Sequence, residues 1–106
     1  PKLASEVTLQ PIRRFGFDGT IIFSDIMVIP DAMGINVRFD KGVGPVLEKV
    51  IDNDCLLNLK TDLTKLEPVY ETINLTKSKL NNKSSLIGFS GSPFTLACYK
   101  RFCDNP

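Results

Sequence analysis

Gly19-Thr-Ile-Ile-Phe-Ser-Asp-Ile-Met-Val-Ile-Pro30 is an apolar run that contains a single carboxylate, Asp25. Its β-branched and aromatic side chains are typical of a parallel strand that is covered on both faces. Burying an ionised carboxylate costs far more than one apolar side chain gains, so the fold must pair Asp25, protonate it or use it. The carboxyl end of such a strand is where α/β folds assemble their sites. Asp25 is therefore a candidate site residue, although a turn cap or an arginine pair also fits the run.

The composition limits the class of protein. The 106 residues fit one domain, and 42% hydrophobic with 24% charged residues is typical of a globular chain. A net charge of +1 without a basic stripe argues against nucleic-acid binding. No apolar run reaches the roughly 18 residues of a membrane span, and no basic-then-apolar leader is seen. We therefore expect a cytoplasmic protein.

The residue types also limit the chemistry. The absence of histidine excludes Ser-His-Asp triads, Cys-His pairs and imidazole-bound zinc. The cysteines Cys55, Cys98 and Cys103 have no disulfide-framework or zinc spacing, so we expect buried reduced thiols. Any catalysis must come from carboxylates, hydroxyls, tyrosine, arginine or lysine.

The first half of the chain predicts a helix and a strand, followed by a segment of short elements. Residues 2–15 predict a helix that Pro11 divides and Gly16 ends. Its apolar positions are Leu3, Val7, Ile12 and Phe15. Residues 20–26 predict a strand that Pro30 terminates. The segment of short elements comprises a helix capped by Asp31 and reaching Met33, a half-exposed strand over 35–39, and a turn at 42–45.

The second half predicts helix, strand and helix after a stretch, 46–62, that shows no clear pattern. Residues 66–81 predict an amphipathic helix with Pro68 in its first turn and Thr72 facing solvent. Residues 85–90 predict a second apolar strand, and Ser92 is the expected N-cap of a helix over 94–103.

This alternation of strands and helices predicts an α/β fold with parallel βα units. A right-handed crossover places the ends of both strands on one rim. Asp25 ends the first strand, the turn at 90–92 ends the second, and Tyr99 lies about two turns into the next helix.

Several blocks, in order, resemble the uroporphyrinogen decarboxylase family between Glu6 and Tyr99. They are Thr8-Leu-Gln-Pro-Ile-Arg-Arg-Phe15, Ile21-Ile-Phe-Ser-Asp-Ile26, Ile29-Pro30 with Ala32-Met-Gly34, Gly42-Val-Gly-Pro45, Ile73-Asn-Leu-Thr76, and Leu86-Ile-Gly-Phe-Ser-Gly-Ser-Pro-Phe-Thr-Leu96 followed by Tyr99. The resemblance implies a (β/α)₈ TIM barrel with its site at the carboxyl rim.

The resemblance also implies the chemistry. In the family, the aspartate of Phe-Ser-Asp accepts hydrogen bonds from the pyrrole N–H groups of uroporphyrinogen, and the four acetate side chains lose carbon dioxide to give coproporphyrinogen in haem biosynthesis. Asp25 then stabilises the pyrrole-derived cation, without any metal or organic cofactor. Tyr99 matches a tyrosine that contacts the substrate. Phe89 matches an aromatic residue of the cleft wall, although core packing fits Phe89 as well. Complete members are cytoplasmic homodimers.

The chain also departs from the family pattern. A complete barrel takes ~250 residues, so we interpret residues 1–106 as a partial barrel too short to close. An arginine-rich segment and later serine and histidine contacts of the family have no match, and Arg13-Arg14 are interpreted as helix-end charges. After Tyr99, residues 100–106 form a non-matching tail.

Three readings therefore remain. The chain is a segment of a decarboxylase, an inactive truncated remnant, or part of a corrinoid methyltransferase on the same barrel. Because an open parallel sheet leaves strand edges unpaired, the isolated chain is expected to be poorly folded and inactive.

Overall fold

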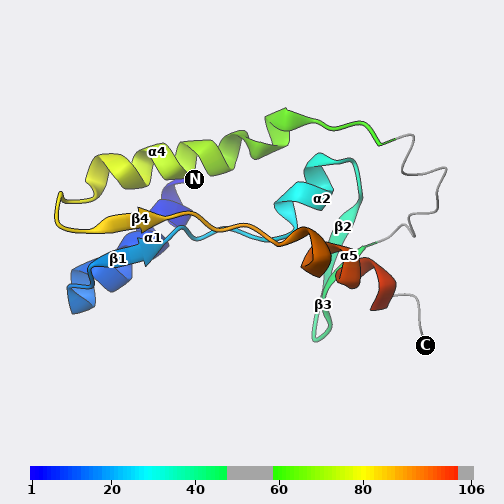
Figure 1. The fold of residues 1–106 in the computed structure, drawn as a ribbon, viewed down its shortest axis with the longest axis horizontal. Helices are drawn as coiled ribbons and strands as arrows, with labels where there is room; N and C mark the ends of the chain where they lie inside the picture. Colours follow the sequence, from blue (N-terminus) through cyan, green and yellow to red (C-terminus); the bar gives the residue numbers. More distant parts are fainter. Residues whose placement is uncertain (48–58, 103–106) are drawn as a thin grey trace. The chain divides into compact units, whose positions relative to one another are not determined.

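The computed structural model describes residues 1–47 and 59–102 (Figure 1). The chain divides into unit 1, which comprises Pro1–Asp25 and Leu66–Ser90, and unit 2, which comprises Ile26–Lys65 and Gly91–Pro106. Most of the stretch over 46–62, most of the tail, and two cysteines, Cys55 and Cys103, lie outside the described residues. None of the described helices is long and apolar enough to cross a membrane.

Unit 1 is built on a pair of parallel strands. Its described elements are α1 (Lys2–Phe15), β1 (Gly19–Ile21), α4 (Glu67–Lys79) and β4 (Ser85–Ile87). Gly19 lies opposite Ser85 and Ile21 opposite Ile87, and the Ile22 N–H extends the ladder by donating to Ile87 O at 3.0 Å. This pairing confirms the predicted α/β class, and the described strands do not close into a barrel.

The first helix has the bounds that the sequence predicts. Gly16 ends α1 with a positive φ of 66°, and its N–H donates to Ile12 O at 2.9 Å. The prediction that Pro11 divides the helix is wrong, because α1 continues through it. Proline removes one helical hydrogen bond, and the packing of α1 against both α4 and β1 outweighs that loss.

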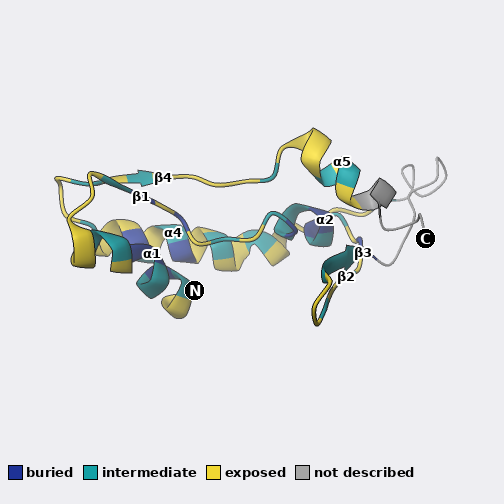
Figure 2. Cartoon of the chain, turned by 90° about the horizontal axis from the view of Figure 1, so that it is seen from below, coloured by how far each residue is buried: buried dark blue, intermediate teal, exposed yellow. Residues whose placement is uncertain are grey.

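The buried face of α1 is not formed by its apolar residues alone. Leu3 and Phe15 are 77% and 68% exposed, whereas Ser5, Thr8 and Leu9 are buried. Two of the three buried residues of α1 are thus hydroxyl residues, and Leu9 is the apolar one. Figure 2 shows the buried parts of α1 and α4 in dark blue.

Five buried hydroxyl residues lie where α1, α4 and β1 meet, and we call them the hydroxyl seam. They are Ser5, Thr8, Thr20, Thr72 and Thr76. Thr72, predicted to face solvent, is 4% exposed and donates to Pro68 O at 2.7 Å. Thr76 donates to Thr72 O at 2.7 Å and lies 3.1 Å from Ser5 Oγ. Because Thr72 and Thr76 donate to backbone carbonyls of their own helix, both hydroxyls have a partner despite their burial.

Unit 2 contains an antiparallel hairpin that the sequence analysis missed. β2 (Val37–Asp40) and β3 (Gly44–Leu47) pair with Val37 opposite Leu47 and Asp40 opposite Gly44. The Val43 N–H donates to Asp40 O at 3.1 Å across the turn. The half-exposed strand predicted over 35–39 is thus present with shifted bounds. The predicted turn at 42–45 lies partly inside β3, since Gly44 already belongs to the strand.

The remaining described elements are α2 (Val28–Ala32), the 3₁₀ helix η1 (Leu63–Leu66), which spans the unit boundary, and α5 (Pro93–Phe102) in unit 2. Met27, Ile35 and Leu47 form the buried cluster of unit 2, and Lys65 Nζ lies 2.9 Å from Asp31 Oδ1.

Two boundaries in this part of the chain differ from the sequence analysis. The strand predicted over 20–26 is shorter, because β1 ends at Ile21. Asp31 does not cap α2 but lies inside it, and Pro30 also lies inside it instead of terminating the strand. Proline is tolerated there because the first N–H groups of a helix have no partner within the helix.

Candidate functional site

Asp25 lies beyond the carboxyl end of β1, at the end of the first segment of unit 1. Its side chain is exposed. The sequence argument from burial therefore does not apply to the described structure, in which solvent reaches the carboxylate. The case for Asp25 rests on the family resemblance and on its place after a parallel strand, and its role stays a prediction.

Thr8 of α1 holds the segment that leads from β1 to Asp25. The Phe23 N–H donates to Thr8 Oγ1 at 2.8 Å, and Thr8 Oγ1 donates in turn to Ala4 O at 2.8 Å. In the middle of β1, Thr20 Oγ1 donates to Thr8 O at 2.5 Å. One residue of α1 thus holds both β1 and the segment that follows it.

Phe89 follows β4 in the same way that Asp25 follows β1. Since β1 and β4 run in parallel, both residues extend from the carboxyl end of the two-stranded sheet. Phe89 is 47% exposed, which does not support the alternative that it packs in a core of unit 1. The alternating positions Ile21, Phe23 and Ile87 are also exposed, whereas Thr20 and Ile22 are buried. The sheet of unit 1 therefore has an exposed apolar face.

Tyr99 belongs to α5 in unit 2 and is 38% exposed. The predicted cap is present, since the Thr95 N–H donates to Ser92 Oγ at 3.4 Å. Cys98, beside Tyr99, is half-buried and forms no disulfide. The structure brings Asp25 and Phe89 into one unit and places Tyr99 in the other, so the predicted meeting of Tyr99 with Asp25 stays a prediction.

The turn before α5 leaves little room for a side chain at Gly91. A Cβ atom on Gly91 would lie 2.8 Å from Leu96 Cδ2 and 3.1 Å from Ile26 Cβ, both closer than ordinary packing allows. Gly91 therefore lets the chain pass close to Ile26, the residue that follows Asp25 in the sequence.

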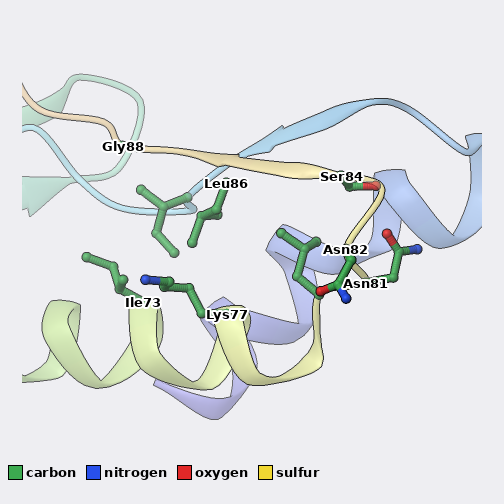
Figure 3. Close-up of a pocket in the computed structure, with 9 residues that line it drawn as sticks. Ile73, Lys77, Asn81, Asn82, Ser84, Leu86 and Gly88 are labelled. Carbon is green, nitrogen blue, oxygen red and sulfur yellow. The ribbon is translucent and has the colours of Figure 1, made fainter.

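Unit 1 contains a cavity of about 420 Å³ that the sequence analysis did not find (Figure 3). Its walls are Ile22, Ile73, Lys77, Leu80, Asn81, Asn82, Ser84, Leu86 and Gly88. Its lining includes neither Asp25 nor Phe89. The amphipathic face predicted for residues 66–81 is the signal that pointed to this region, because Ile73 and Leu80 belong to that face.

The pKa of one described carboxyl is shifted by hydrogen bonds, and that group lies in unit 2. The Thr64 hydroxyl and then the Thr64 N–H, which donate to Asp62 Oδ1 at 2.6 and 3.0 Å, lower the pKa of Asp62 below 3.8. These bonds fix the start of η1, and Asp62 is not one of the predicted site residues.

A comparison with protein families identifies the relationship. The sequence model described as "Uroporphyrinogen decarboxylase (URO-D)" matches residues 1–101. The chain belongs to the uroporphyrinogen decarboxylase family. It is 52% identical over 99 residues to a protein named uroporphyrinogen decarboxylase from Orientia tsutsugamushi (strain Ikeda), and 52% identical over 101 residues to one of the same name from Brucella ovis.

Each of these two matches covers 93% of this chain but 29% of the relative. The chain therefore spans less than a third of the length of the curated decarboxylases that it matches. The match confirms the family resemblance that the sequence blocks indicated. It does not by itself show that this chain has the activity of the complete relatives.

Proposed function

We propose that this chain is a segment of a uroporphyrinogen decarboxylase, a carboxy-lyase of porphyrin and haem biosynthesis. The observation that carries the proposal is the family match over residues 1–101, together with 52% identity to proteins named for this activity. The parallel pairing of β1 and β4 suits two neighbouring strands of a (β/α)₈ barrel. The same names favour a decarboxylase over a corrinoid methyltransferase on a similar barrel.

In this proposal, the reaction needs no metal or organic cofactor. A pyrrole ring of uroporphyrinogen is protonated on carbon and becomes an electron sink. The bond between an acetate methylene and its carboxylate then breaks, carbon dioxide leaves, and the electron pair neutralises the ring. A proton added to the methylene carbon, with loss of the ring proton, leaves a methyl group. Repeating this at four acetates gives coproporphyrinogen.

Asp25 has the central role in the proposal. Its carboxylate accepts hydrogen bonds from pyrrole N–H groups and stabilises the positive charge that develops before carbon dioxide leaves. Tyr99 donates its hydroxyl hydrogen to a substrate carboxylate or to Asp25, and Phe89 lines the cleft. Enclosure by the rest of a complete barrel would strengthen the interaction, because a charge acts more strongly where water is excluded.

The chain alone is proposed to be inactive. The exposed apolar face of the sheet, formed by Ile21, Phe23, Ile87 and Phe89, and the edges of β1 and β4 call for further strands to cover them. The same observation favours the second candidate, an inactive remnant without catalysis of its own. If the chain is a segment of a decarboxylase, the complete enzyme would be a cytoplasmic homodimer.

A chimera tests the proposal. Residues 1–101 of this chain would replace the matching segment of the Brucella ovis decarboxylase, and conversion of uroporphyrinogen to coproporphyrinogen would be measured. We expect an active chimera in which Asp25→Asn lowers kcat by about 100-fold or more. Asp18→Asn, which changes an exposed carboxylate in the turn before β1, is the matched control and should leave kcat unchanged.

The outcomes separate the readings. A folded but inactive chimera would favour the remnant. An active chimera in which Asp25→Asn keeps full kcat would remove Asp25 from its catalytic role.

A further inference from the structure

We infer that Thr8 is a positioning residue for Asp25, an inference that rests on the proposed function. Thr8 is 2% exposed and lies on α1, whose buried face packs against β1. Its hydroxyl donates to Ala4 O, the bond that a threonine commonly makes inside a helix. The acceptor side of the same oxygen bonds to the Phe23 N–H at 2.8 Å. This second bond reaches the segment that carries Asp25.

The bond to Phe23 satisfies a backbone N–H that faces away from β4. The Ile22 N–H points to β4 and donates to Ile87 O at 3.0 Å. Since successive N–H groups of a strand point to opposite sides, the Phe23 N–H lies on the edge away from β4. In the described residues, β1 pairs with β4 alone. The Thr8 hydroxyl therefore satisfies a backbone donor that β4 does not reach.

A second bond makes this link rigid. Thr20 Oγ1, in the middle of β1, donates to Thr8 O at 2.5 Å. With Thr20 and Phe23 both held on Thr8, β1 cannot slide along α1 without breaking two hydrogen bonds, of which the one to Thr20 is buried. The point at which the chain leaves β1 toward Ser24 and Asp25 is thereby fixed. A displacement of a catalytic group by 1 Å lowers rates by about 100-fold.

The test uses the Brucella chimera and three substitutions. Thr8→Val keeps the shape and removes the hydroxyl, whereas Thr8→Ser keeps the hydroxyl. Thr76→Val is the matched control, because it removes another buried hydroxyl of the seam, whose hydrogen bonds are with Ser5 and Thr72. Unfolding midpoint, kcat and KM would be measured for each, with the Asp25→Asn variant beside them.

Both valine variants should lower the unfolding midpoint, since each removes a buried hydrogen bond. Only Thr8→Val should also lower kcat, by about 2- to 10-fold, with little change in KM. Thr8→Ser should restore kcat. In the Asp25→Asn background, Thr8→Val should cause no further loss of kcat, because a positioning residue acts through the group that it positions.

Equal kcat in the Thr8→Val and Thr76→Val chimeras would overturn the inference and leave Thr8 with a structural role. If Thr8→Val does not fold, Thr8→Cys replaces it, because sulfur is a weak acceptor. Equal kcat for the Ser and Cys variants would then overturn the inference. If Asp25→Asn lowers kcat and Thr8→Val does not, the inference fails alone. If Asp25→Asn keeps full kcat, the proposed role of Asp25 fails first.

Discussion

Replacing Thr76 with valine removes a hydroxyl from the centre of the hydroxyl seam without changing the shape of the side chain. Thr76 is fully buried, and so is Ser5, whose hydroxyl lies 3.1 Å away. The substitution leaves Ser5 Oγ without its partner from α4 in a place that solvent does not reach. A buried polar group left unsatisfied costs about 1–3 kcal/mol. We therefore expect Thr76→Val to lower the free energy of unfolding by that amount.

The double variant provides the critical comparison. Ser5→Ala with Thr76→Val removes both partners, and replacing both partners of a hydrogen bond by apolar groups is nearly neutral. The double variant should thus lie within about 1 kcal/mol of the parent chimera, closer than Thr76→Val alone. Urea unfolding of the Brucella chimera measures both, with an unchanged m-value as the check on compactness. Ser78→Ala, an exposed hydroxyl of α4, is the control.

Two results would refute this reasoning. The first is a Thr76→Val variant as stable as the Ser78→Ala control, which would show that the seam contributes no net stability. The second is a double variant less stable than Thr76→Val, which would show that packing of Ser5, and not its hydrogen bond, holds α1 against α4.

Three further predictions follow from the two units and the open sheet. The isolated chain should show no cooperative thermal transition and no turnover of uroporphyrinogen; finding both would contradict the partial-barrel interpretation. Gly91→Ala should destabilise the chimera by about 1–3 kcal/mol in thermal unfolding, because the added Cβ meets Leu96 and Ile26; an unchanged midpoint would show that these side chains move aside. The pKa of Asp62 is lowered in the folded chain, so its contribution to stability is present above pH 3.8 and is lost as the pH falls through the folded pKa. In the Brucella chimera, Thr64→Val should raise that pKa toward 3.8 in an NMR titration, and an unmoved titration would contradict the assignment.

Local signals in the sequence predicted the helices that lie between clear boundaries. The glycine at the end of α1 and the proline in the first turn of α4 fixed their bounds to within two residues at each end. The parallel pairing of β1 with β4 followed from the alternation of elements along the chain. These features depend on residues near one another in sequence or on a general rule of topology.

The packing of unit 1 could not be predicted in the same way. Periodicity arguments count apolar residues, whereas Ser5 and Thr76, which link α1 to α4, are polar and fall outside that count. The hairpin of β2 and β3 was missed for a related reason. Phe39 and Val43 are exposed, so the apolar pattern gave no sign that the two short strands pair.

The candidate site was predictable in part. A carboxylate inside an apolar run drew attention to Asp25, and family blocks added Phe89 and Tyr99. The sequence could not show that Asp25 is exposed in this chain, because burial at the site depends on strands beyond the described ones. Thr8 was visible only as part of a family block, since its role depends on a hydrogen bond to the backbone of Phe23.

The bonds of Thr8 also bear on the order in which the chain acquires its structure. They join residues 12 and 15 positions apart, whereas the bond between Thr76 and Ser5 closes a loop of 71 positions. The entropic free-energy cost of closing the longer loop exceeds that of closing the shorter ones by about 1.5 kcal/mol. As the polypeptide leaves the ribosome, α1 and β1 are thus able to associate before α4 has been synthesised. The nascent chain would then offer β4 a template already in register.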